Sequence, residues 1–227
     1  MVAVNARDPL ALSSALSVLA ATAAVWVVAT SSVQHGALVV ALPALAGLAA
    51  GIRLVRRGHR LVGGLVGLGG TAGLGLAVTR ATAGTPVQWA ELYPALLGMT
   101  LLTLGLAPIR RGWERWFVTA GTAMVFVAVV TSGVVQSATT MGLLAGGVAT
   151  VVAWDLGEQA VNLSSHVGTD ARTWTVESTH GVASVAVGAL AIGMALTVTD
   201  FDVTGVPLAG LGVLLGATVV LSAALYN

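Results

Sequence analysis

The side chains best suited to chemistry gather between Asp155 and His180. They are Asp155, Glu158, Asn162, His166, Asp170, Arg172, Glu177 and His180. Glu177 and His180 form a Glu-x-x-His pair, a spacing that puts both ligands on one helix face in carboxylate-bridged metal centres. Such centres need a second pair of this kind, and the sequence has none. We therefore predict no metal, no cofactor and no catalytic residue, and keep a metal centre and a proton carrier as alternatives.

The same stretch has the pattern of an amphipathic helix. Asp155, Glu158, Gln159, Asn162 and His166 recur at the spacing of one helix face. This pattern predicts that the span ending near Trp154 continues outward, with an extension and turn over residues 155–175. We interpret the polar stripe as a surface for docking a partner protein, formed by Asp155, Glu158, Asn162, His166, Glu177 and His180.

The rest of the chain is too apolar for a soluble domain. Of 227 residues, 56% are hydrophobic and 8% charged, whereas soluble domains have roughly 25% charged residues. The predicted fold is an all-α polytopic bundle, one integral membrane domain over 1–227, because lipid-facing segments must satisfy their backbone groups internally. About eight runs approach the ~20 residues that cross a bilayer. They are 10–32, 36–55, 60–80, 89–108, 115–135, 138–156, 176–198 and 206–226.

The arginines predict the orientation of these spans. All but Arg80 fall on one side of the eight-span arrangement, and the connections 31–35 and 136–139 on the other side contain none. Cytoplasmic loops are enriched in Lys and Arg, so both termini are expected in the cytoplasm of a multi-pass cell-membrane protein. The residues that set this topology are Arg53, Arg56, Arg57, Arg60, Arg110, Arg111 and Arg115.

Composition also excludes several function classes. The chain has no Cys, and its ten basic residues are all Arg, which removes thiolate chemistry and Lys Schiff bases. A net charge of +1 gives no reason to expect nucleic acid as a partner. No predicted span has a charge at its centre, where transporters commonly have one. Arg80 and Glu91 either form an interfacial ion pair or line an outer vestibule.

Glycines predict how the spans pack. Gly63 and Gly67, and Gly69 and Gly73, form small-xxx-small pairs in the third span. Such pairs let helix backbones approach closely in lipid. We expect them to pack spans within one chain. The same pattern recurs at Gly142 and Gly146 and at Gly212 and Gly216.

Two segments resemble an uncharacterised multi-pass membrane-protein family of halophilic archaea. They are Val152-Ala153-Trp154-Asp155-Leu156-Gly157-Glu158-Gln159-Ala160-Val161 and Val176-Glu177-Ser178-Thr179-His180-Gly181-Val182-Ala183-Ser184-Val185-Ala186-Val187-Gly188, and the resemblance extends over 145–227. It implies an accessory subunit of a membrane assembly without an assigned chemistry, and it assigns no functional residues.

These observations favour a non-enzymatic integral membrane protein. We predict an accessory or scaffold subunit whose partners are the lipid bilayer and other membrane or cytoplasmic subunits. The first alternative is a transporter of a small solute, and the second is a metal-dependent membrane enzyme.

Overall fold

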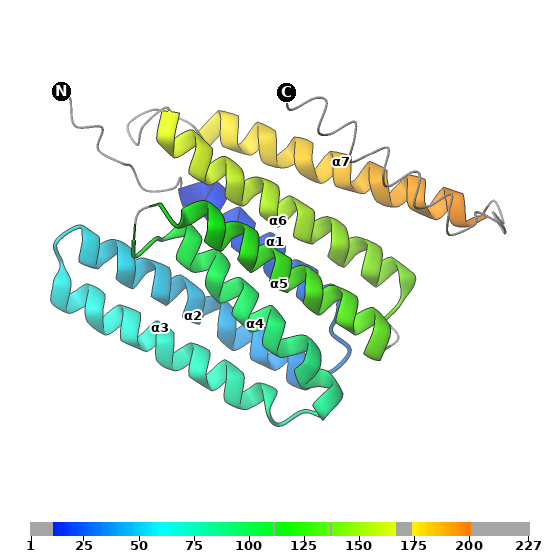
Figure 1. Cartoon of the computed structure of the whole chain (residues 1–227), viewed down its shortest axis with the longest axis horizontal. Helices are drawn as coiled ribbons and strands as arrows, with labels where there is room; N and C mark the ends of the chain where they lie inside the picture. The colour runs from blue at the N-terminus through cyan, green and yellow to red at the C-terminus, as the bar shows by residue number, and fades with distance from the viewer. Residues whose placement is uncertain (1–10, 111, 137, 167–173, 201–227) are drawn as a thin grey trace. The chain divides into compact units, whose positions relative to one another are not determined.

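The computed structural model of the chain describes residues 11–110, 112–136, 138–166 and 174–200. This part is all-helical (Figure 1). Its seven α-helices are α1 (Ala11–Val28), α2 (Ser32–Arg56), α3 (Arg60–Ala81), α4 (Pro86–Leu106), α5 (Glu114–Val135), α6 (Thr140–His166) and α7 (Trp174–Asp200). Six of the described helices, α2 to α7, are long and apolar enough to cross a membrane, and α1 contains a shorter apolar run. The protein is therefore compatible with a membrane.

The first seven predicted spans correspond to these helices, and the eighth, 206–226, lies outside the described residues. One predicted connection, 31–35, is wrong because α2 already begins at Ser32. Ser31 is the N-cap: its hydroxyl accepts from the Gln34 backbone N–H, and the Gln34 side chain accepts in return from the Ser31 N–H. This capping box satisfies backbone groups that a helix start leaves open. Thr85 and Gln88 start α4 in the same way.

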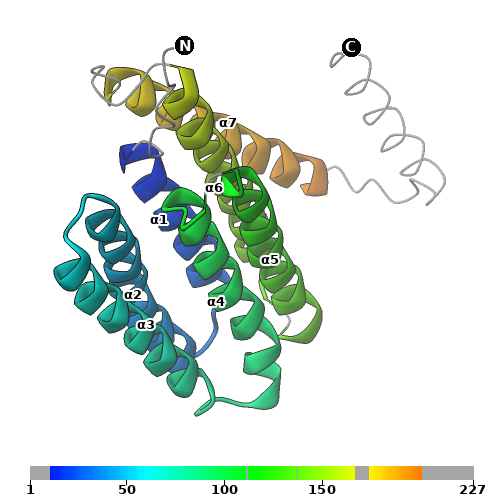
Figure 2. The same ribbon diagram turned by 60° about the vertical axis from the view of Figure 1, so that its left-hand side comes forward.

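The chain divides into two compact units, residues 1–189 and 190–227. Within the first unit, α2 pairs with α3, α4 with α5, and α1 with α6. Figure 2 shows α2 and α3 as a hairpin at one side of the helices. We call the end at which α2 and α4 stop and α1, α3 and α5 start the arginine-rich end. The end with the α1–α2 and α3–α4 connections is the opposite end.

Glycines bring α2 and α3 together within one chain, as predicted. A Cβ atom at Gly51 would lie 2.4 Å from the backbone nitrogen of Gly67, and one at Gly70 would lie 2.4 Å from that of Leu48. The contact face differs from the predicted pairs in one respect. Gly70 takes the place expected for Gly69, whose Cβ would meet open space. The helical repeat of 3.6 residues explains this, because Gly70 follows Gly63 by about two turns.

The surface of α3 is apolar opposite this glycine face. Leu61, Leu65 and Leu68 are 85%, 72% and 68% exposed. Exposed leucines at this density on one helix are uncommon in soluble proteins but suit contact with lipid. The fold therefore buries small residues between helices and turns larger ones outward.

Candidate functional site

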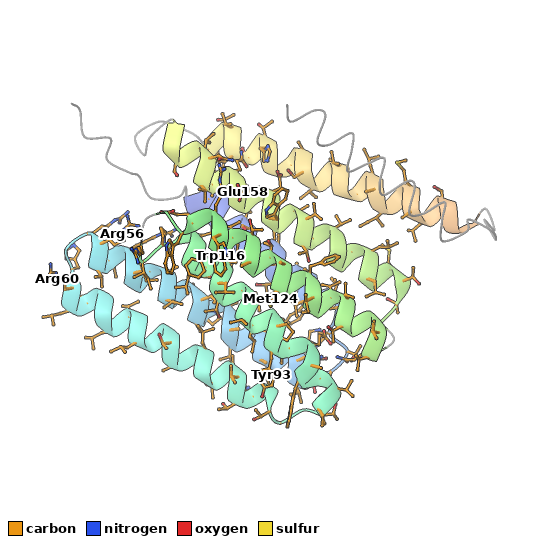
Figure 3. All side chains as sticks on the ribbon, viewed as in Figure 1. Arg56, Arg60, Tyr93, Trp116, Met124 and Glu158 are labelled. Carbon is orange, nitrogen blue, oxygen red and sulfur yellow. The ribbon has the colours of Figure 1, made fainter. Side chains whose placement is uncertain are left out.

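The predicted polar stripe lies on α6 near the arginine-rich end. The helix continues past Trp154 to His166, as the amphipathic pattern indicated. Asp155, Glu158 and Asn162 on this stretch are half-buried. Figure 3 shows Glu158 toward the same end as Arg56, Arg60 and Trp116, whereas Tyr93 lies toward the opposite end.

Asp155 connects α6 to α7. Its Oδ2 atom lies 2.8 Å from Nε2 of His180 and accepts a hydrogen bond from the Ser184 hydroxyl. His180 and Ser184 are four positions apart, so one helix face presents both to the same carboxylate. Both side chains of the Asp155–His180 pair are 39% exposed. The group is therefore an interhelical clamp at a partly solvated surface.

Arg115 connects α5 to the same stripe. Its Nε atom lies 3.3 Å from Oε2 of Glu158, and it also donates to Oδ1 of Asn162. Glu158 and Asn162 are four positions apart on α6, which lets one guanidinium contact both. The Arg115 side chain is 64% exposed and that of Glu158 is 18% exposed.

Glu177 has a different role from its neighbour His180. It is 4% exposed, and its Oε2 atom accepts hydrogen bonds from the backbone N–H and the hydroxyl of Ser13, each at 2.8 Å. Ser13 lies in the first turn of α1, where backbone N–H groups have no partner within the helix. The positive end of the α1 dipole also favours a carboxylate there. Glu177 therefore fixes the start of α1 against α7.

Sequence spacing grouped Glu177 with His180, but their partners differ. Glu177 contacts Ser13, and His180 contacts Asp155. Among the residues that the structure describes, no three His, Asp or Glu side chains are placed to hold a metal ion. The side chain of His166, and Asp170 and Arg172, lie outside the described part.

The second polar site surrounds Glu91 near the opposite end. Glu91 lies in the second turn of α4 and is 0% exposed. Its Oε2 atom accepts from Nε2 of Gln34 on α2 at 2.9 Å, and from Nε2 of Gln136 just after α5. The Oε1 atom is buried and has no hydrogen-bond partner among the described residues. Three helices thus converge on one carboxyl group.

The α1–α2 connection fixes the orientation of these amides. Oε1 of Gln34 accepts from the backbone N–H groups of Thr30 and Ser31 at 2.9 and 3.1 Å, so its NH2 group must face Glu91. The Thr30 hydroxyl donates to Oε1 of Gln136 at 2.6 Å. Ser132 on α5, next to the carboxyl group, donates to the Val28 carbonyl at 3.1 Å.

Arg80 does not complete this site. It is exposed at the end of α3, and no ion pair joins it to Glu91 among the described residues. The partners of Glu91 come from segments about 45 and 57 positions away, which spacing alone does not reveal. The available signal was the Ser31–Gln34 capping box, which places the long amide side chain of Gln34 at a helix start.

The arginines predicted to set topology also hold the arginine-rich end together. Arg53 and Arg56 on α2 donate to the Leu106 and Pro108 carbonyls at 3.4 and 3.5 Å. Cations at a helix C-terminus interact favourably with its dipole. The guanidinium of Arg110 lies 5.3 Å from the Trp113 ring centre, within cation–π range. Arg57 and Arg60 are exposed, and Arg111 lies outside the described residues.

Comparisons with known proteins find a family but no characterised relative. No curated protein and no solved structure matches the chain. A family model described as a family of unknown function matches residues 69–222. The match begins well before the predicted resemblance over 145–227 and includes α4, α5, α6 and α7. The chain belongs to this family of unknown function, DUF7519.

Proposed function

We propose that the protein is a non-enzymatic subunit of a cell-membrane assembly, with the arginine-rich end and both termini in the cytoplasm. The six apolar helices support the membrane placement, and the arginines at one end support the orientation. In this proposal, residues 206–226 form an eighth span. The absence of lysine supports a source among halophilic archaea.

The length of α6 is the observation that carries the docking role. Its 27 residues extend over ~40 Å, about 10 Å more than the hydrocarbon core of a bilayer. The last turns of α6 therefore project into water together with the first turn of α7. Asn162 lies on this projection, and Asp155 and Glu158 lie within about two turns before it. All three are half-buried and already bonded to neighbouring helices. A surface ordered before binding loses little conformational entropy when a partner docks.

Glu177 is unsuitable for testing the docking surface by substitution, because it also holds the start of α1. Replacing Glu177 would disturb the start of α1, so it does not isolate docking. Asn162→Arg adds charge and bulk on the projecting stripe, and Ala83→Arg makes the same kind of change at an exposed position in the α3–α4 connection. The test first identifies proteins crosslinked to the wild-type chain in native membranes, then measures binding of the purified partner to each variant. We expect Asn162→Arg to weaken binding at least tenfold and Ala83→Arg to leave it unchanged. Equal binding by all three chains would contradict the docking role.

Small-solute transport is the second candidate, and one observation favours it. Glu91 is a buried carboxyl group inside a membrane-compatible helix, and such groups are commonly functional. The test measures uptake of a small solute into proteoliposomes that contain the wild-type protein or the Glu91→Gln variant. Uptake by the wild type that is lost in a folded Glu91→Gln variant would support this candidate over the subunit role. Stoichiometric iron or zinc in the purified protein would instead favour the metal-dependent enzyme.

A further inference from the structure

One of the two carboxyl oxygens of Glu91 lies buried without a hydrogen-bond partner among the described residues. This atom is Oε1, whereas Oε2 accepts from the amide NH2 groups of Gln34 and Gln136. A buried polar atom that has no partner loses its hydration and gains no hydrogen bond in return. An ionised carboxyl group can only accept hydrogen bonds, whereas a protonated one also donates one. Oε1 is therefore the atom at which a proton would change the bonding of this site.

The Ser132 hydroxyl is suited to accept a hydrogen bond from such a proton. Ser132 is buried on α5 next to the Glu91 carboxyl group. A hydroxyl group has one hydrogen and two acceptor lone pairs, and Ser132 donates its hydrogen to the Val28 carbonyl at 3.1 Å. Val28 is the last residue of α1, where carbonyl groups have no partner within the helix. The Ser132 oxygen can therefore only accept from Glu91, which calls for a proton on the carboxyl group.

The charged and titratable side chains on the surrounding helices are placed elsewhere. On α2, Nδ1 of His35 lies 2.9 Å from the Ser31 carbonyl, and the arginines are in the last turn. Arg80 of α3 and Tyr93 of α4 are exposed. The described part of α1 has no charged residue, and those of α5 and α6 lie toward the arginine-rich end. An ionised Glu91 would thus be an uncompensated buried charge, which costs far more to bury than a neutral acid.

We propose that Glu91 is a proton-binding site, in which the protonated Oε1 atom donates to the Ser132 hydroxyl while Oε2 accepts from the two glutamines. The proton comes from water and returns to it at the opposite end. Gln136 is half-buried and contacts both Glu91 and the exposed Thr30, so one side chain connects the site with the surface. The bound proton adds a hydrogen bond between α4 and α5. This inference requires neither docking nor transport, so it can fail while either of them stands.

The test measures the infrared spectrum of the full chain in phosphatidylcholine vesicles at neutral pH. A protonated carboxyl group has a C=O stretching band that is separate from the bands of ionised carboxylates. We expect this band in the wild type and its loss in Glu91→Gln. Glu158→Gln makes the same change at a carboxylate that pairs with Arg115, and this variant should keep the band. Absence of the band from the wild type, or its persistence in a folded Glu91→Gln variant, would overturn the proposal.

Removing the proposed acceptor provides an independent arm that keeps the carboxyl group and decides the proposal if Glu91→Gln does not fold. Ser132→Ala should move the C=O band to higher frequency, because the Glu91 O–H group then loses its hydrogen-bond acceptor. Thr131→Ala removes a hydroxyl that donates to the Val127 carbonyl at the neighbouring position of α5, and it should leave the band in place. An unchanged band in Ser132→Ala, or an equal shift in both variants, would contradict a proton held between Glu91 and Ser132.

Discussion

The carboxylates at the two ends of the helices differ in what surrounds them. At the arginine-rich end, Glu158 pairs with Arg115, Asp155 with His180, and Glu177 with the first turn of α1. Near the opposite end, Glu91 is surrounded by the neutral amides of Gln34 and Gln136. One oxygen of Glu91 has no partner among the described residues, although the side chain is 0% exposed.

This difference separates two uses of a polar residue between apolar helices. A carboxylate next to a cation or a helix N-terminus holds two helices together with its charge compensated. A buried carboxyl group that receives only amide hydrogen bonds costs more to bury, because its desolvation is not offset by an opposite charge. The arginine-rich end therefore resembles a set of structural clamps, and Glu91 is the more unusual group.

Removing Glu91 should have the largest effect on stability. Glu91→Ala leaves the NH2 groups of Gln34 and Gln136 without their acceptor in a buried site, at a cost of about 3 kcal/mol in the free energy of unfolding. Glu91→Gln keeps the side-chain volume and one acceptor oxygen, so it should lower the free energy of unfolding by only about 1 kcal/mol. Unfolding in mixed detergent–SDS micelles measures both. A larger loss for Gln than for Ala would contradict this account of the site.

Glu177→Ala should have an intermediate effect of about 2 kcal/mol, because it removes the acceptor for two groups of Ser13 at the start of α1. Ser13→Ala removes only the hydroxyl bond and should cost about 1 kcal/mol. The double variant should be little less stable than Glu177→Ala, since both changes break the same contact. If the losses in the free energy of unfolding are fully additive in the same assay, Glu177 stabilises the protein through contacts other than the one with Ser13.

Arg115→Gln should have the smallest effect, below ~1 kcal/mol, because its side chain is 64% exposed and its pair with Glu158 is screened by solvent. The loss should shrink further in high salt. Repeating the measurement with Glu158→Gln and with both substitutions gives the coupling between the two side chains. A coupling free energy above about 2 kcal/mol would contradict this expectation, because the Arg115–Glu158 contact would then be as strong as the buried contacts of Glu91 and Glu177.

Much of the helical arrangement could be predicted from the sequence. Long apolar runs and arginine-rich connections located the first seven helices because crossing a bilayer imposes length and hydrophobicity on each segment. The start of α2 could not be located this way. Ser31 and Gln34 look like a polar loop by composition, yet their reciprocal hydrogen bonds begin a helix. The close packing of α2 on α3 was also predictable, although which glycines touch depends on how the two helices face each other.

The polar contacts were harder to predict because they depend on helix pairing. Periodicity correctly placed Asp155, Glu158 and Asn162 on one face of α6. It did not show that Arg115, 47 positions before Asn162, would lie against that face. Glu91 was expected near Arg80 because the two flank one connection. Instead, the burial of Glu91 follows from packing with α2 and α5.

Labelling single cysteines at the two ends tests the proposed membrane placement most directly. The chain has no Cys, so His59→Cys in the α2–α3 turn and Ala83→Cys in the α3–α4 connection each provide one thiol at an exposed position. In intact cells, a membrane-impermeant maleimide should label Ala83→Cys at once and His59→Cys only after permeabilisation. Labelling of His59→Cys in intact cells, or equal labelling of both variants, would contradict a membrane protein with its arginine-rich end in the cytoplasm.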